Sequence, residues 1–363
     1  MSMYSDDDEN LTSDEDFQEL VYKIAFPRRK KKFRHRIDHF VEWNEQEFLD
    51  RFRLSKSTVM YLVEKLKSKI SSRTTRNNAL TAREKVLLTL RYYATGSMIK
   101  VAADFVGVHE STASRVIRLV SYYLARLRPE FIEYPTSEEE LSEIRQGFFN
   151  IAQFPRCIGA VDCTHVKILS PGGQDAEIFR NRKRFFSYNV QAVCDSNLRF
   201  LNVVCRWPGS SHDSTIFNNS SIKYKFEDGE FGNDLLVGDG GYGVRNYLIT
   251  PLRNPITAAE KKFNFAQIRT RNPIERTFGV WKRRFPILAV GINLEVTSVE
   301  MVVTATAVLH NIARFFGDAM PAVERGIERL VDLTEFDAEE FAVPPINVNQ
   351  IQRDTLINYF DAL

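Results

Sequence analysis

Four carboxylates between residues 162 and 275 have the types and settings of metal ligands. Asp162 and Asp239 each end an apolar run that is typical of a core strand, while Asp213 and Glu275 lie in polar motifs. Carboxylates carried by such strands can converge at one edge of a sheet. Their oxygens are the ligands that Mg²⁺ and Mn²⁺ prefer, and two such ions about 4 Å apart can stabilise the attacking and leaving oxygens of phosphodiester cleavage together. The sequence therefore predicts a centre for divalent metal ions.

Each of these acids also has a purely structural explanation. Aspartates at strand ends commonly cap loops. Asp213 begins a predicted short helix and is suited to be its N-terminal anion. Asn272, Pro273 and Glu275 fit the N-cap, N1 and N3 positions of a capping box, which predicts a helix over residues 273–285. These structural roles are compatible with metal binding.

A mixed-sheet α/β domain over residues 146–317 is expected to position the acids. Short apolar runs predict strands at residues 157–161, 166–169, 188–194, 200–206 and 235–238. Asp195, Ser196 and Asn197 lie between two of these runs and predict an antiparallel hairpin. Apolar residues at helical spacing predict a further helix over residues 298–316.

Residues 37–134, which precede this domain, are predicted to be all helical. Thr81 and Glu84 form a capping box that opens one helix, and Gly96 stops it. A short helix over residues 98–105, a glycine turn and a longer helix follow. This order is typical of a helix-turn-helix, whose last helix can enter the major groove of DNA.

The last of these helices is expected to begin near His109 and to carry cations outside its core face. Arg115 and Arg118 are placed there and can reach phosphates or base edges. Many helical bundles show the same pattern without touching DNA, so the motif alone leaves both interpretations open.

The net charge of +2 is unevenly distributed along the chain. Residues 1–20 hold eight acids and no Lys or Arg, and residues 318–363 hold ten acids and three arginines, so residues 21–317 carry a net charge of +17. A body of this sign suits a polyanionic partner, because Lys and Arg supply most of the sequence-independent affinity for nucleic acid. The alternative is ordinary solvated surface charge.

Three segments outside the two domains complete the predicted organisation. Residues 1–36 are expected to be a disordered acidic leader with a basic run, which acts either as a nuclear-entry signal or as an arm on the DNA backbone. Residues 135–145 are polar and acidic and are expected to form a linker. Residues 318–363 are expected to be an acidic tail that closes on a short helix over residues 353–359.

The four cysteines show no C-x-x-C pairing, which argues against a structural zinc site and for a reducing compartment. The acidic first 20 residues do not resemble a secretory signal, and the sequence has no continuous run of about 18 apolar residues. We therefore expect a soluble, intracellular protein without membrane partners.

Several short motifs follow one another in a fixed order between roughly residues 40 and 360. They are Asp162-Cys-Thr-His165, the hairpin of residues 188–195, Trp207-Pro-Gly to His212-Asp213, Gly238-Asp239-Gly-Gly-Tyr242, Thr250-Pro-Leu252, residues 271–279 with 282–286, and Ala307-Val-Leu-His310-Asn311-Ile312. In order and spacing they resemble the successive motifs of PIF/Harbinger transposases and of the nucleases domesticated from them, which are DDE superfamily endonucleases.

This resemblance implies a ribonuclease H-like catalytic domain with a DDE metal centre. Asp162, Asp239 and Glu275 fall on the catalytic triad of the family, with 35 residues between the last two, and Asp213 falls on its further metal-binding carboxylate. The implied cofactor is a divalent cation, Mg²⁺ or Mn²⁺. Gln267 departs from the family pattern, which often has histidine at that place.

Further residues are expected to support the centre. His165 and His212 lie beside the acids and are expected to position a scissile phosphate or to bind the second oxygen of a carboxylate, the alternative being structural histidines. Cations expected to contact DNA are Arg115, Arg118, Arg182, Lys183, Arg271, Lys282 and Arg283.

The function implied by the resemblance is hydrolysis of phosphodiester bonds in DNA by a two-metal mechanism. One alternative is a domesticated DNA-binding or regulatory protein without transposition activity, and another is a scaffold without DNA affinity. The resemblance also implies a homo-oligomer that acts on double-stranded DNA with a Myb-like DNA-binding partner protein. The expected location is the nucleus, with the cytoplasm as a second location.

Overall fold

The computed structural model describes residues 36–72, 74, 76, 78–322, 324–334 and 351–363, and the separate positions 18, 21, 22 and 25. The chain divides into two units, residues 1–36 and residues 37–363. Apart from five positions, the acidic leader and basic run expected in the first unit lie outside the described residues, as does the stretch 335–350 of the expected acidic tail.

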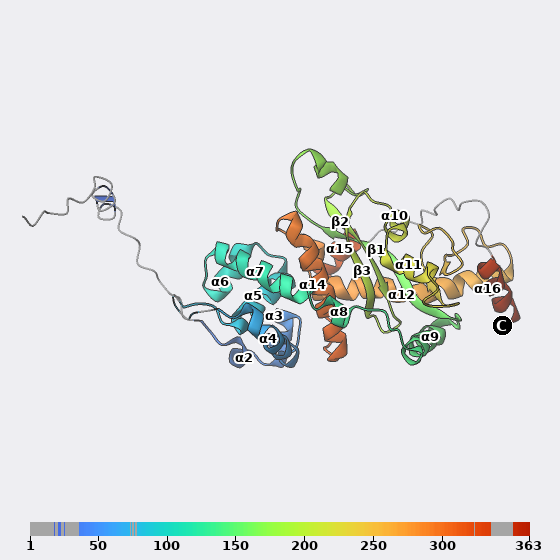
Figure 1. Ribbon diagram of the computed structural model, residues 1–363, viewed down its shortest axis with the longest axis horizontal. Coiled ribbons are helices and arrows are strands. Elements are labelled where there is room, and N and C mark those ends of the chain that lie inside the picture. The colour runs from blue at the N-terminus through green and yellow to red at the C-terminus, as the bar shows by residue number, and fades with distance from the viewer. Residues whose placement is uncertain are drawn as a thin grey trace, which may run out of the picture. The chain divides into compact units, whose positions relative to one another are not determined.

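The second unit begins with seven helices, all within residues 39–131 (Figure 1). They are α2 (His39–Glu42), α3 (Glu45–Phe52), α4 (Lys56–Ile70), α5 (Ala82–Thr95), α6 (Ile99–Val106), α7 (Glu110–Ala125) and α8 (Arg128–Phe131). The capping box of Thr81 and Glu84 opens α5 as predicted. Gly96 ends α5 and Gly107 ends α6, both with positive φ (60° and 64°), the left-handed conformation that glycine adopts without strain.

The predicted linker at residues 135–145 is wrong, because α9 (Glu138–Ala152) occupies most of it. The Ser137 side chain accepts a hydrogen bond from the backbone N–H of Glu140, and three glutamates in the first turn suit the positive end of the helix dipole. Leu141, Ile144 and Phe148 are buried at helical spacing. The helix packs against β1 (Cys157–Lys167), the first strand of the sheet. The polar residues that suggested a linker are therefore the solvent-facing side of an amphipathic helix.

Five strands form one mixed sheet in the order β3-β2-β1-β4-β5. They are β1 (Cys157–Lys167), β2 (Ser187–Cys194), β3 (Phe200–Pro208), β4 (Leu235–Val237) and β5 (Leu248–Ile249). β2 pairs antiparallel with β1 and β3, whereas β4 pairs parallel with β1 and β5. The mixed α/β architecture and the hairpin between β2 and β3 are confirmed. Two predicted strands merge into β1, because its pairing with β2 continues without a break from Ala160 to Lys167.

The helices between β1 and residue 315 are η1, a short 3₁₀ helix (Gln174–Phe179), α10 (Asp213–Asn218), α11 (Ser221–Glu227), α12 (Ala258–Arg284), α13 (Ile287–Val290) and α14 (Val296–Phe315). The predicted helix start at residue 273 is wrong. α12 begins 15 residues earlier, where Thr257 and Glu260 form its capping box, and Pro273 lies buried inside it. Proline cannot donate one helical hydrogen bond, and the long buried face of α12 offsets this loss.

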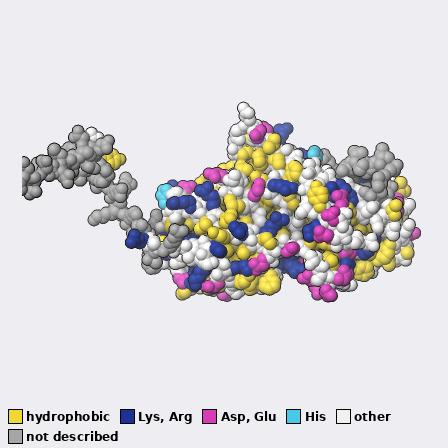
Figure 2. Space-filling view, in the orientation of Figure 1, with side chains coloured by type: hydrophobic (Ala, Val, Ile, Leu, Met, Phe, Trp, Pro, Cys, Tyr) yellow, Lys and Arg dark blue, Asp and Glu magenta, His cyan; other side chains and the backbone are white. Residues whose placement is uncertain are grey.

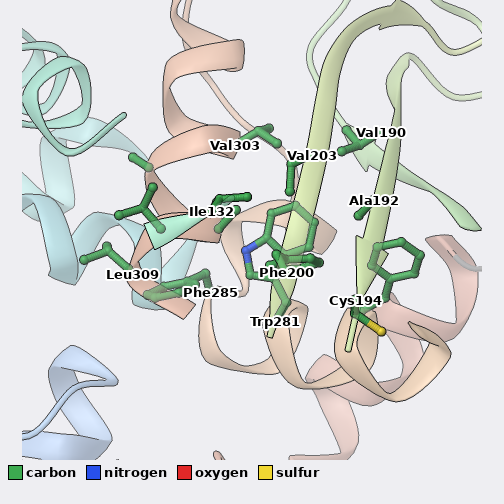
Figure 3. Packing of buried hydrophobic residues seen from close by; sticks show 14 of the residues in the cluster. Ile132, Val190, Ala192, Cys194, Phe200, Val203, Trp281, Phe285, Val303 and Leu309 are labelled. Carbon is green, nitrogen blue, oxygen red and sulfur yellow. The ribbon is translucent and has the colours of Figure 1, made fainter. Parts of the chain in front are cut away.

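A single hydrophobic core joins helices α2–α8, which we call the helical front, to the sheet. The two predicted domains at 37–134 and 146–317 are therefore not separate bodies. Figure 3 shows Phe200 of β3 against Trp281 of α12, with Ile132, Val303 and Leu309 close by. α14 packs on α7 and on β3. Among the described residues, α14 is the one helix long and apolar enough to cross a membrane, and 72% of its apolar stretch is buried inside the fold.

The C-terminal segment is anchored where a tail was predicted to start. Asp318 is buried and accepts hydrogen bonds from the backbone N–H of Ser55 (3.1 Å) and from Oγ1 of Thr58 (2.9 Å). α15 (Arg325–Thr334) packs on α13, and α16 (Ile351–Ala362) packs on α12. The predicted short terminal helix is therefore present and is longer than the sequence indicated.

Candidate metal centre

Three of the four predicted carboxylates meet in one place. Asp162, Asp213 and Asp239 each offer an oxygen, and these atoms all lie within 4.8 Å of one another. Asp213 is the first residue of α10, and Asp239 lies two residues beyond β4. Asp162 does not end its strand as predicted but lies inside β1, opposite Ala192 of β2. Parallel pairing of β1 with β4 brings Asp162 and Asp239 to neighbouring strands.

Hydrogen bonds from the surrounding chain orient each of these carboxylates. The backbone N–H of Cys163 donates to Oδ1 of Asp162 at 2.8 Å, and that of Gly241 donates to Oδ1 of Asp239 at 3.0 Å. The side-chain amide of Asn189 donates to Oδ1 of Asp213 at 2.9 Å. Each acid uses one oxygen for these bonds, which holds its carboxylate in a defined orientation.

Glu275 is connected to this group through Arg271. The Arg271 guanidinium donates from Nη1 to Oδ2 of Asp162 at 3.0 Å and from Nη2 to Oε1 of Glu275 at 2.6 Å. The Asp162 side chain is 14% exposed and that of Glu275 is 51% exposed. Of the four predicted carboxylates, the three aspartates therefore cluster, and Glu275 is joined to Asp162 through Arg271.

The three aspartates repel one another in a poorly solvated site. The pKa of Asp162 is raised well above its ordinary value, mainly by burial and secondly by the negative charge of Asp239. Burial and the charge of Asp213 raise the pKa of Asp239 to about 6, and burial raises the pKa of Asp213. The proton-bound forms are favoured chiefly because burial disfavours a charged carboxylate and, for Asp162 and Asp239, because of the neighbouring negative charges. A bound divalent cation would compensate that charge. Three hard oxygens are the donor set that Mg²⁺ and Mn²⁺ prefer.

Two residues of α12 that were not predicted to act here hold the loops that carry the acids. Gln267 donates from Nε2 to the carbonyl oxygens of Gly238 (2.7 Å) and Ile249 (3.0 Å), and so ties α12 to the ends of β4 and β5. Asn264 exchanges two hydrogen bonds with the backbone of Leu252, both at 2.8 Å. Both residues lie at helical spacing from Arg271 and Glu275, and this spacing is the sequence signal that could have identified them as neighbours of the site.

The two predicted supporting histidines have different surroundings. His165 is buried, lies 2.9 Å from Oγ of Ser187, and has its pKa lowered to about 3, chiefly by burial, so its ring is neutral. These contacts favour the alternative that His165 is a structural histidine. His212 is exposed, and its Nδ1 accepts a hydrogen bond from Nη2 of Arg182 at 3.0 Å. Since His212 caps α10, this contact places a cation beside Asp213.

The predicted DNA-contacting cations on α12 need correction. Lys282 is fully buried and hydrogen-bonded to Thr164, so it is not on a surface that DNA can reach. Arg283 is mostly buried and pairs with Glu328 at 3.1 Å. Arg271 belongs to the centre itself. The exposed cations of this helix are instead Lys261, Lys262, Arg269 and Arg276.

The remaining predicted cations lie near the surface. Arg115 on α7 and Arg182 and Lys183 before β2 are exposed. Arg118 is partly exposed and pairs with Glu295 at 3.3 Å. On the face shown in Figure 2, Lys and Arg side chains are distributed among acidic and apolar ones.

Comparison with known proteins places this geometry in a family. Residues 161–311, which contain all four carboxylates, match the family model described as "DDE superfamily endonuclease". The chain is 33% identical over 284 residues to "Putative nuclease HARBI1" of Homo sapiens, covering 73% of this chain and 80% of the relative. It is 28% identical over 282 residues to the protein of that name from Xenopus laevis, covering 73% of this chain and 81% of the relative.

A plant protein is also similar. "Protein ALP1-like" of Arabidopsis thaliana is 24% identical over 257 residues, covering 65% of this chain and 63% of the relative. No solved structure gives a significant match.

Proposed function

Since the chain belongs to the Harbinger transposase-derived DDE endonucleases, we propose that it is a divalent-metal-dependent DNA endonuclease with a ribonuclease H-like catalytic domain. It hydrolyses phosphodiester bonds by a two-metal mechanism. The observation that carries the proposal is the convergence of Asp162, Asp213 and Asp239 within 4.8 Å. These acids come from three separate elements of the fold, and a hard cation explains why their charges are brought together.

The donor set suits Mg²⁺ or Mn²⁺, which Asp162, Asp213 and Asp239 would hold. When bound, the ions supply activation of water and stabilisation of the leaving oxygen. Arg271 neutralises Asp162 and keeps Glu275 oriented toward the centre. Arg182, held by His212, places a positive charge where a DNA phosphate approaches Asp213.

DNA is also expected to bind at the helical front. α5, α6 and α7 follow in the order of a helix-turn-helix, with the exposed Arg115 on the last helix. Arg115 and Arg118 are proposed to contact phosphates or base edges. By resemblance to the family, we further propose double-stranded DNA as the substrate, a homo-oligomeric state, a Myb-like partner protein and a nuclear location.

Cleavage of supercoiled DNA in Mn²⁺ tests the proposal. The variants Asp162→Asn, Asp239→Asn and Glu275→Gln are expected to lose more than about 100-fold in nicking rate, because each removes a negative oxygen from the centre. Asp175→Asn, which alters an exposed acid on η1, is the matched control and should cleave like the parent. Undiminished cleavage by the three site variants would contradict the assignment.

A second candidate function is DNA binding without cleavage. It is favoured by the ion pair between Arg271 and Glu275, because in this arrangement Glu275 is bound by an arginine. Protein that binds DNA tightly and never nicks it with any divalent ion would establish this regulatory role in place of the nuclease.

A further inference from the structure

The solvent-facing side of α12 carries cations and an exposed aromatic ring. We call its exposed residues Lys261, Lys262, Phe265, Arg269 and Arg276 the α12 ridge. The Phe265 side chain is 63% exposed, and the guanidinium of Arg269 lies 5.3 Å from the centre of its ring. The exposed ring of Phe265 offers a flat aromatic surface on which another ring can stack, and the guanidinium of Arg269 lies beside it.

The cations of the ridge have no acidic partners. Lys261, Lys262, Arg269 and Arg276 form no salt bridge within the part of the chain that the structure describes. The ridge lies on the same helix as Glu275 and forms a strip of uncompensated positive charge on the solvent-facing side of that helix. Such a strip attracts a phosphate backbone.

A hollow of about 480 Å³ lies at the end of the ridge farther from Glu275. The end of α9, the first half of α12 and the end of α16 line it, and α9 and α16 each pack against α12 (Figure 1).

The lining combines three kinds of groups. Phe265, Ile151 and Phe360 are apolar, and Lys262 and Arg269 bring positive charge. The amide nitrogen of Asn150 and the side-chain amide of Gln153 form no hydrogen bond with other described residues, and amides can recognise the edge of a base.

We propose that this hollow binds an unstacked nucleobase of the DNA strand that leaves the metal centre, with Phe265 as the stacking platform and Lys262 and Arg269 on the adjoining phosphates. This inference rests on the proposed function. Phe265 precedes Glu275 by ten residues, which is about 15 Å along a helix. At about 3.4 Å per nucleotide, the rise of a stacked strand, this distance along α12 corresponds to four or five nucleotides. Stacking of this kind tolerates any base, because every base has an aromatic face.

Binding of metal-free protein to DNA with and without a single-stranded end tests the site. Fluorescence anisotropy is measured on a blunt duplex and on the same duplex with a six-nucleotide overhang. Phe265→Ala is expected to weaken binding of the overhang DNA by about tenfold and binding of the blunt duplex by less than about twofold. Phe265→Tyr keeps the ring and should bind like the parent.

Matched controls separate stacking from general damage. Ile268→Ala removes another exposed apolar side chain of α12 outside the hollow and should change neither affinity. The double variant Lys262→Gln/Arg269→Gln should weaken binding and reduce the slope of log affinity against log salt by one to two. 2-Aminopurine placed at the fourth or fifth nucleotide should lose fluorescence quenching in Phe265→Ala.

The outcomes distinguish this inference from the proposed function. If the parent binds and cleaves DNA while Phe265→Ala binds overhang DNA as tightly as the parent, the nucleobase site is refuted and the nuclease stands. If the parent binds tightly to the overhang only through Phe265 but never cleaves, the site stands without the nuclease. A parent without any DNA affinity refutes both.

Discussion

Arg271 forms a 3.0 Å ion pair with Asp162, a residue 109 positions earlier in the chain. Its other guanidinium nitrogen pairs with Glu275 at 2.6 Å, one turn further along α12. One cation thus links an aspartate of the central strand to a glutamate of the long helix. The ion pairs partly neutralise a site whose aspartates otherwise repel one another.

Removing this cation is expected to favour metal binding. In Arg271→Met, a divalent ion no longer competes with the guanidinium for Asp162, so Mn²⁺ affinity measured by calorimetry should rise about three- to tenfold, which corresponds to roughly 1 kcal/mol. The metal-free variant should melt at a lower temperature, because the unpaired carboxylates repel one another. Arg276→Met, on the exposed face of the same helix, should change neither quantity. Weaker Mn²⁺ binding by Arg271→Met would contradict this role.

Asp239 is expected to make metal-free stability depend on pH. Its pKa is raised in the fold from 3.8 to about 6, so the folded protein binds the extra proton more tightly than the unfolded chain does. The resulting stabilisation is complete below pH 4 and is lost as the pH rises through 6, by on the order of 3 kcal/mol. Melting temperatures measured without metal should therefore fall between pH 5 and pH 7.5.

The Asp239→Asn variant tests the cause of that pH dependence. Without metal at pH 7.5 it should melt above the parent, since a repelling charge is gone. With excess Mn²⁺ the order should reverse, because the variant lacks a ligand. Asp175→Asn serves as the control, and an unchanged pH profile in Asp239→Asn would assign the effect to other groups.

Gln267 is expected to position the Asp239 loop through its two amide hydrogen bonds. Gln267→Leu leaves the buried carbonyl oxygen of Gly238 without its donor, whereas that of Ile249 keeps the backbone N–H of Gly238 at 3.1 Å. The substitution should cost about 1–3 kcal/mol in urea unfolding. Mn²⁺ affinity should fall about tenfold, as for other groups that orient a metal ligand. Gln267→His, the residue frequent in the family, retains a donor and should lose less of both. Equal losses in the two variants would argue against a hydrogen-bonding role.

Asn311 is expected to hold α14 to the hairpin of β2 and β3. Its Oδ1 accepts from the backbone N–H of Phe200 at 2.8 Å, and its Nδ2 donates to the carbonyl oxygens of Phe200 and Phe131, both at 2.7 Å. Asn311→Leu removes all three bonds in a buried site and should lower the free energy of unfolding by about 3 kcal/mol or more. A loss below about 1 kcal/mol, measured by urea denaturation, would show that solvent replaces these bonds.

Local patterns in the sequence predicted much of the secondary structure. The capping box at Thr81, the glycine stops after α5 and α6 and the turn at Asp195 each depend on neighbouring residues, and all are present. Local pattern also misled at Pro273. Asn272, Pro273 and Glu275 resemble the N-cap, N1 and N3 positions of a helix start, but the buried face of α12 continues the helix through the proline.

The chain alone identified four candidate acids, because Asp162, Asp213, Asp239 and Glu275 lie in short motifs that can be recognised without coordinates. Only the tertiary structure showed that the three aspartates cluster. Only the tertiary structure decided which charges face one another. It placed Arg271 between Asp162 and Glu275, buried Lys282, and left Lys262 and Arg269 exposed beside the hollow. The reason is that a side chain's environment depends on packing between elements distant in sequence, and helical spacing alone does not say which face of α12 meets the sheet.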